Sequence, residues 1–154
     1  MALGNVRFGP AFPATFMPIY GPKGASEAWE QGAQLIEHDA QLDESGSDPA
    51  ANTVVGIAAE DTTTAAAAGV LVPYYPNMPN VIWVGTINIS TGGYVTDGSE
   101  FLTEYGTLID ADGIHYINQA DTTGPSVRVI GYLDPIGTTN SRVYFQYVDT
   151  PLFG

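Results

Sequence analysis

The strongest constraint on the fold is an alternation of apolar and polar residues with a period of two. In the segment VIWVGTINI (81–89), Val81, Trp83 and Ile87 fall on one face, and SVRVIGYLD (126–134) and RVYFQYVD (142–149) repeat the pattern. A period of two is typical of a β-strand with one buried face. Turns rich in Gly, Pro and Asp separate such segments at a spacing of about 8–12 residues. The sequence therefore predicts an all-β chain, folded as a small antiparallel β-barrel or sandwich.

Shorter apolar segments bring the expected number of strands to about nine. They are residues 33–38, 53–59, 70–76, 94–96, 105–109 and 114–117. Pro73 lacks a backbone N–H, which predicts an edge strand or a strand end at 70–76. At most short helical turns are expected, at 26–31 after Ser26 and at 62–69 before Gly69. The acidic segment 39–52 is expected to be a surface loop.

Residues 1–24 are predicted to form an extended N-terminal arm, and residues 25–154 a β-rich domain. Four prolines in the arm fix φ and remove backbone donors, which disfavours a helix or a central strand. The aromatic side chains of this segment are too apolar for a solvated linker, so they must be buried on the domain or on a neighbour. We therefore expect an interface formed by Arg7, Phe8, Phe12, Phe16, Met17, Tyr20 and Lys23.

The charge balance excludes several partners. Four basic residues stand against 17 acidic ones, for a net charge of −13. Nucleic acid and anionic membrane surfaces both attract cationic proteins, so neither is an expected partner. Arg7 and Lys23 precede the first acidic residue, so residues 1–26 carry +2 while all 17 acids follow. The chain has no cysteine, so its fold depends on packing or oligomerisation rather than on disulfides.

The start of the chain does not resemble a secretory signal. Three prolines fall within the first twenty residues and interrupt any apolar core. No apolar run reaches the roughly 18 residues that a membrane span needs. We therefore expect a soluble chain, or one that leaves the cell by a route without a signal.

No motif predicts catalysis, a metal site or a cofactor. Asp110, Asp112 and Gly113 resemble the start of a calcium loop, but Ile114 and Asp121 occupy the fifth and twelfth positions, where such a loop needs a ligand and a glutamate. An Asp-Gly turn between two strands explains these residues better. His38 and His115 are expected on the surface or in a hairpin, and no G-x-S-x-G motif accompanies them. The chain is not expected to be an enzyme.

Sugar binding is the other possibility that the aromatic residues raise. Trp29, in SEAWEQG, is the better candidate for an exposed ring, whereas Trp83 lies on an apolar strand face and is expected in the core. There is no Gly-rich loop with a lysine before a helix, so no phosphate site is predicted.

The region from Trp29 to Tyr75 resembles the head decoration, or capsid cement, proteins of tailed bacteriophages. The resemblance rests on WEQGAQLIEHDA, with a G-x-x-L strand, on VVGIA, which fits V-x-G-[IFV]-A, and on the connector TTTAAAAG before VLVPYY. It implies a small β domain, usually trimeric, at threefold positions on the outside of an icosahedral capsid, assembled in the host cytoplasm. The implied partners are the major capsid protein and further copies of the chain.

The resemblance and the arm together suggest a mechanism of attachment. Phe8, Phe12, Phe16 and Tyr20 would be buried against capsid subunits, while Arg7 and Lys23 would meet acidic capsid surface. Each buried aromatic would contribute about 1.5–3 kcal/mol, and three arms would add avidity. Three alternatives remain: a carbohydrate-binding or fibre-tip module, a small hydrolase that uses His38 or His115, and a tail or neck component.

Overall fold

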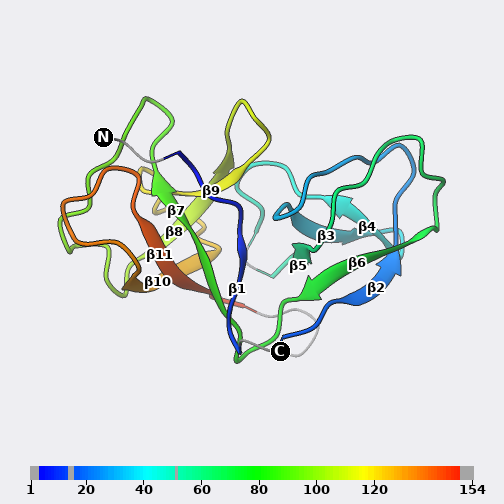
Figure 1. Cartoon of the computed structure of the whole chain (residues 1–154), viewed down its shortest axis with the longest axis horizontal. Helices are drawn as coiled ribbons and strands as arrows, with labels where there is room; N and C mark the ends of the chain where they lie inside the picture. Colours follow the sequence, from blue (N-terminus) through cyan, green and yellow to red (C-terminus); the bar gives the residue numbers. More distant parts are fainter. Residues whose placement is uncertain (1–3, 14–15, 51, 150–154) are drawn as a thin grey trace.

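The computed structural model describes residues 4–13, 16–50 and 52–149. This part of the chain contains eleven β-strands and no helix. Figure 1 shows the strands in two groups that lie side by side, one with β1 and β7–β11 and the other with β2–β6. The all-β prediction is therefore confirmed, and the first group is a small barrel.

The barrel is a ring of five strands. In order around the ring they are β7 (Ile82–Asn88), β11 (Arg142–Tyr147), β10 (Val127–Tyr132), β8 (Glu104–Ile109) and β9 (His115–Asn118). A parallel pairing of β9 with the end of β7, at Ile87↔Ile117 and Asn88↔Asn118, closes the ring. β1 (Gly9–Phe12) pairs antiparallel with the first half of β7, so it extends the same wall.

The second group is a curled antiparallel sheet. Its strands are, in order, β2 (Ile19–Pro22), β6 (Leu71–Pro76), β5 (Val54–Ala58), β3 (Gln34–His38) and β4 (Gln41–Glu44). Its two edges approach each other at a parallel bridge between Lys23 and Leu42. The N–H of Gly24 donates to the carbonyl of Leu42 at 2.8 Å, so the sheet comes close to closing on itself.

β5 is the wall between two apolar cores. Val54 and Ile57 belong to the barrel core, whereas Val55 and Ala58 belong to the core of the second sheet. All five residues of the strand are buried for this reason. Gly56 is required here, because a Cβ at this position would lie 2.6 Å from the Tyr74 ring.

The period-two segments form the barrel as predicted. Their alternate apolar side chains point inward, and the most deeply buried of them are Trp83, Ile87, Val127, Val129, Val143 and Phe145. At about 25 cal/mol per Å² of buried apolar surface, this core is the main source of the barrel's stability. Trp83 is thus a core residue, as expected.

Three local predictions are wrong. No helical turn forms at 26–31 or 62–69, because Trp29 and Thr62 pair with each other in a β-bridge and Ser26 has a left-handed φ of 60°. The acidic segment is not all loop: Asp39 and Ala40, both at positive φ, make a two-residue turn that leads into β4. Residues 94–96 form no strand, only a single bridge from Val95 to Thr139.

Pro73 lies inside the sheet rather than on an edge strand. β6 has β2 on one side and β5 on the other. The Pro73 carbonyl accepts a hydrogen bond from Ala59 N at 3.1 Å, just beyond the last residue of β5. The nitrogen and carbonyl of one strand residue face the same side. The side of Pro73 that lacks an N–H therefore faces Ala59, beyond the end of β5. No hydrogen bond between β6 and β2 is lost.

Candidate functional surface

The predicted arm is built into the fold as two strands. β1 adds to the barrel and β2 to the second sheet, so the segment before residue 24 connects the two groups. Phe8 is only 3% exposed and its ring centroid lies 4.9 Å from that of Phe145 in the barrel core. Phe16 packs on Tyr75 and edge-on against Trp83. Phe8 and Phe16 therefore do not form an outward-facing interface, which corrects the expectation from sequence.

The two cations of the segment also have partners within the chain. Arg7 forms an ion pair with Glu30 at 2.8 Å and donates to the Gln31 carbonyl at 2.9 Å. Lys23 is fully buried, and its Nζ donates to the carbonyls of Gly24 and Ala66 at 3.0 and 3.1 Å. The buried ammonium fastens the point where β2 meets β4. Lys23 is thus a structural residue. Because its side chain is buried, it is not available for the expected contact with an acidic capsid surface.

The remaining predicted residues are exposed. Phe12, Met17 and Tyr20 are 52%, 76% and 65% exposed, and Ile19 and Leu71 join them at 47% and 64%. Tyr20 pairs with Pro73, and Pro22 with Leu71, so Tyr20 and Leu71 are diagonal neighbours on the outer side of β2 and β6. We call these five exposed side chains the apolar strip; Ile19 lies on the opposite face of β2 from Tyr20, because successive strand residues alternate.

The apolar strip lies where two segments without charged side chains come together. Residues 8–22 and residues 62–96 contain no Asp, Glu, Lys, Arg or His. The fold pairs them twice, through β1 with β7 and through β2 with β6. Their connecting turns meet as well, at an apolar hollow of about 240 Å³ lined by Pro13, Phe16, Met78, Pro79, Asn80 and Val81. We call the surface formed by β1, β2, β6, this hollow and the apolar strip the uncharged face.

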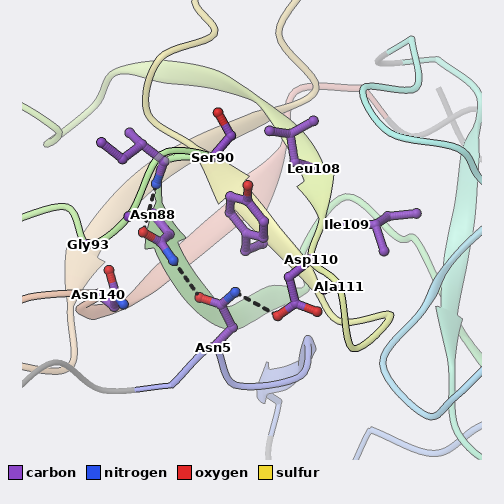
Figure 2. Close-up of a pocket in the computed structure, with 12 residues that line it drawn as sticks. Asn5, Asn88, Ser90, Gly93, Leu108, Ile109, Asp110, Ala111 and Asn140 are labelled. Carbon is purple, nitrogen blue, oxygen red and sulfur yellow. Dashed lines mark hydrogen bonds between the residues drawn. The ribbon is translucent and has the colours of Figure 1, made fainter.

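A second candidate site is a groove at the Asn88 end of β7, whereas the apolar hollow lies beside Val81 before the start of this strand. Figure 2 shows it, with Asn5, Asn88 and Asp110 joined in a row by hydrogen bonds. Its volume is about 540 Å³. Asn88 Nδ2 donates to Asn5 Oδ1 at 3.0 Å, and Asn5 Nδ2 donates to Asp110 Oδ2 at 2.9 Å. Nothing in the sequence pattern indicated this site, because the residues come from three separate segments.

The predicted Asp-Gly turn forms one end of this groove. Asp110 Oδ1 accepts from the N–H groups of Asp112 and Ile114 at 2.8 and 2.9 Å, and Gly113 has a φ of 79°. Asp110 thus stabilises the turn between β8 and β9. In the described residues no group of three or more His, Asp or Glu side chains is placed to hold a metal ion.

The two histidines have different environments. His38 is exposed and contacts Asp43 at 3.0 Å, as expected for a surface residue. His115 lies in the β8–β9 hairpin, which is one of the two positions predicted for it, and its side chain is buried. Its Nε2 lies 2.9 Å from Glu44 Oε1, and its Nδ1 lies 3.3 Å from Gln34 Nε2. Because the Gln34 amide nitrogen donates, Nδ1 accepts and Nε2 carries the hydrogen.

The Gln34 side chain links the second sheet to the barrel. Besides His115, its Nε2 donates to Thr107 Oγ1 at 2.8 Å, and its Oε1 accepts from the Tyr147 hydroxyl at 2.7 Å. Gln34 is on β3, whereas its three partners are on β8, β9 and β11. This buried network joins the two groups of strands, and His115 is 1% exposed within it.

Trp29 is not the exposed ring that a sugar site would need. It is 4% exposed and belongs to the core of the second sheet. Trp29 pairs with Thr62 in an antiparallel β-bridge, a contact between distant segments that no sequence pattern indicated.

No protein-family model matches this chain, and no curated protein sequence matches it. In the part of the chain that the structure describes, no helix has the length and apolar character to cross a membrane.

Proposed function

We propose that this protein is a structural virion protein that binds the outer surface of an icosahedral phage capsid and stabilises it, as a trimer at threefold positions. The observation that carries the proposal is the uncharged face on a chain with a net charge of −13. Large apolar side chains left exposed on uncharged segments favour a protein–protein contact there. The major capsid protein and further copies of this chain are its proposed partners.

Charge distribution supports docking through this face. Two copies of a strongly acidic chain repel each other, and so do this chain and an acidic capsid. The repulsion is smallest at segments that carry no acidic side chain, such as β1, β2 and β6, although Glu37 lies beside Gly21 and Pro22 at the edge of β2. Full burial of an exposed apolar side chain contributes about 1.5–3 kcal/mol, and the side chains of the apolar strip, which are 47–76% exposed, would gain a part of that each. Three copies that bind together would gain further from avidity.

Attachment without an arm differs from the mechanism expected from sequence. The N-terminal segment contributes Phe12 from β1 and Ile19 and Tyr20 from β2, at positions fixed by strand pairing, and Met17 lies just before β2. A pre-ordered surface loses less conformational entropy on binding than a free arm does. We therefore propose that the face docks as a rigid surface and needs no arm to wrap around a neighbour.

The test is co-sedimentation with heads assembled from the major capsid protein of the same phage and lacking this chain. The wild-type chain should pellet with the heads, and Met17→Ser/Tyr20→Ser should stay in the supernatant. Val95→Ser/Leu102→Ser is the matched control, because these side chains are 51% and 59% exposed but lie outside the uncharged face. Failure of the wild type to pellet, or equal pelleting of both double variants, would refute the proposal.

A further inference from the structure

We propose that the groove at the end of the barrel binds a neutral carbohydrate through Asn5, Asn88 and Asp110. The inference is independent of capsid binding, because the groove lies at the Asn88 end of β7 and the uncharged face begins at its Val81 end. β1, the part of the uncharged face that pairs with β7, reaches Val84, which is four residues before Asn88 at about 3.3 Å each. The volume of about 540 Å³ is within the range of small-molecule sites.

The charges around the groove exclude anionic ligands. Asp110 is the single charged side chain among the residues that line it, and none of them is Lys or Arg. Phosphate, sulfate and carboxylate groups are bound in proteins mainly by cationic side chains or by clusters of backbone N–H groups. A ligand here is therefore not an anion, and it must satisfy amide and carboxylate groups.

The row of polar side chains retains unused hydrogen-bonding capacity. An amide nitrogen carries two hydrogens. Within the described residues, Asn5 Nδ2 uses one of them on Asp110, and Asn88 Nδ2 uses one on Asn5. Two N–H donors and a lone pair of Asp110 Oδ2 remain. A donor and an acceptor 2.9 Å apart suit neighbouring hydroxyl groups of a sugar, since each hydroxyl both donates and accepts.

The site is held in place before any ligand arrives. Asp110 Oδ1 is fixed by two backbone N–H groups of its own turn, and Asn88 Oδ1 accepts from Ile89 N at 2.8 Å. Such pre-organisation lowers the entropy lost on binding.

The other lining residues provide an apolar wall and room for a ring. Ile89, Leu108 and Tyr116 offer carbon surface for the C–H faces of a sugar, and Gly92 and Gly93 have no side chains to fill the space. A neutral sugar differs from a purely apolar ligand because it presents hydroxyl groups as well as C–H surfaces. The polar side chains of this groove suit the hydroxyl groups, and its apolar wall suits the C–H surfaces.

The experiment is an NMR titration of ¹⁵N-labelled full-length protein with glucose, galactose, mannose and N-acetylglucosamine. At least one sugar should bind with a Kd in the millimolar range and shift resonances of residues 88–93 and 108–116. Glucuronate and glucose 6-phosphate should not bind. Asn5→Leu should weaken binding at least about tenfold, the effect of losing one or two hydrogen bonds to a polar ligand.

Two further variants complete the design. Ser90→Tyr fills the groove from an exposed position, so it should abolish binding even if Asn5→Leu alters the start of the chain. Asn52→Leu makes the same substitution as Asn5→Leu at an exposed residue outside the groove and the uncharged face, and it should leave binding unchanged. The proposal is overturned if none of the four sugars binds, if the two anionic sugars bind equally well, or if Ser90→Tyr binds like the wild type.

Discussion

Glu100 is fully buried, and its carboxylate accepts four hydrogen bonds. Two come from the hydroxyls of Tyr94 and Tyr132, at 2.5 and 2.8 Å, and two from the backbone N–H groups of Asp97 and Gly98, at 3.0 and 2.9 Å. Burial opposes ionisation of Glu100, but the hydrogen bonds outweigh it and hold the pKa of this carboxyl below its usual value. Burial and the neighbouring carboxylate in turn raise the pKa of both tyrosines. The loop at 94–100 is therefore organised around one ionised side chain.

Glu100→Gln should destabilise the protein by about 2–4 kcal/mol at neutral pH, because a neutral amide cannot accept all four hydrogen bonds. Because the pKa of Glu100 is lowered in the folded state, the ionised carboxylate gives its full contribution to folding stability above pH 4.5, the ordinary pKa of the group. That contribution is lost as the pH falls through the lowered pKa. The variant should therefore lose less stability than the wild type between neutral and acidic pH. Urea unfolding across this range measures both effects.

Glu104→Gln is the control for Glu100→Gln. Glu104 pairs with Arg128 on the surface, so its loss should cost no more than about 1 kcal/mol. Equal destabilisation by the two variants would contradict the role assigned to Glu100.

At the scale of elements, the two phenylalanines at the ends of β1 lie in opposite environments, Phe8 buried and Phe12 exposed. Phe8, just before the strand, enters the barrel core, and Gly85 makes room for it, since a Cβ there would lie 2.5 Å from the Phe8 ring. Phe12, at the end of the strand, remains half-exposed beside Tyr144. The register of β1 on β7 shifts between Pro10 and Phe12, which helps to separate the two side chains.

Phe8→Ala should cost about 3–5 kcal/mol in unfolding free energy, as expected for a large cavity in a core. Phe12→Ala, the same substitution four residues later, should cost about 1 kcal/mol or less, since it leaves no enclosed cavity. Guanidinium unfolding of the two variants gives the comparison. If the N-terminal segment were a detachable arm, both substitutions would have equally small effects.

The strands of the barrel could be predicted from sequence because each has one face in the core. β7, β10 and β11 alternate for that reason, and Val143, Phe145 and Tyr147 are buried as the pattern indicated. β1 and β2 lack such a pattern, because prolines and glycines hold half of their positions. Their composition indicated extended structure but not which partner strand they would find.

The candidate sites were harder to predict than the strands. Lys23 and Glu100 are charged in sequence and buried in the fold, and only the tertiary partners explain why. The apolar strip was predicted in part, through Phe12, Met17 and Tyr20, because their composition called for burial on some surface. Leu71 completes the strip through a pairing of β2 with β6 that sequence alone did not reveal.

At the scale of the whole molecule, Gln34 holds the second sheet against the barrel. Gln34→Leu would leave Tyr147, Thr107 and His115 without their partner in the buried interface, at a cost of roughly 1–3 kcal/mol for each unsatisfied group. The chain offers one tryptophan in each core, Trp29 in the second sheet and Trp83 in the barrel.

Fluorescence of Trp29→Phe and Trp83→Phe backgrounds should therefore report the unfolding of each part separately. We expect coincident urea transitions in the presence of Gln34, because the cores share β5. In Gln34→Leu, both midpoints should fall, with the second sheet unfolding first. Unchanged midpoints would show that the network does not couple the two parts.

Light scattering of the purified chain, with and without Met17→Ser/Tyr20→Ser, gives the solution mass and shows whether the uncharged face joins copies of the chain. If the uncharged face is self-complementary, the wild-type mass should be three times the 16.3 kDa of one chain, and the double variant should have the mass of a monomer. A wild-type chain that remains monomeric at every concentration, or a double variant that remains trimeric, would contradict the account.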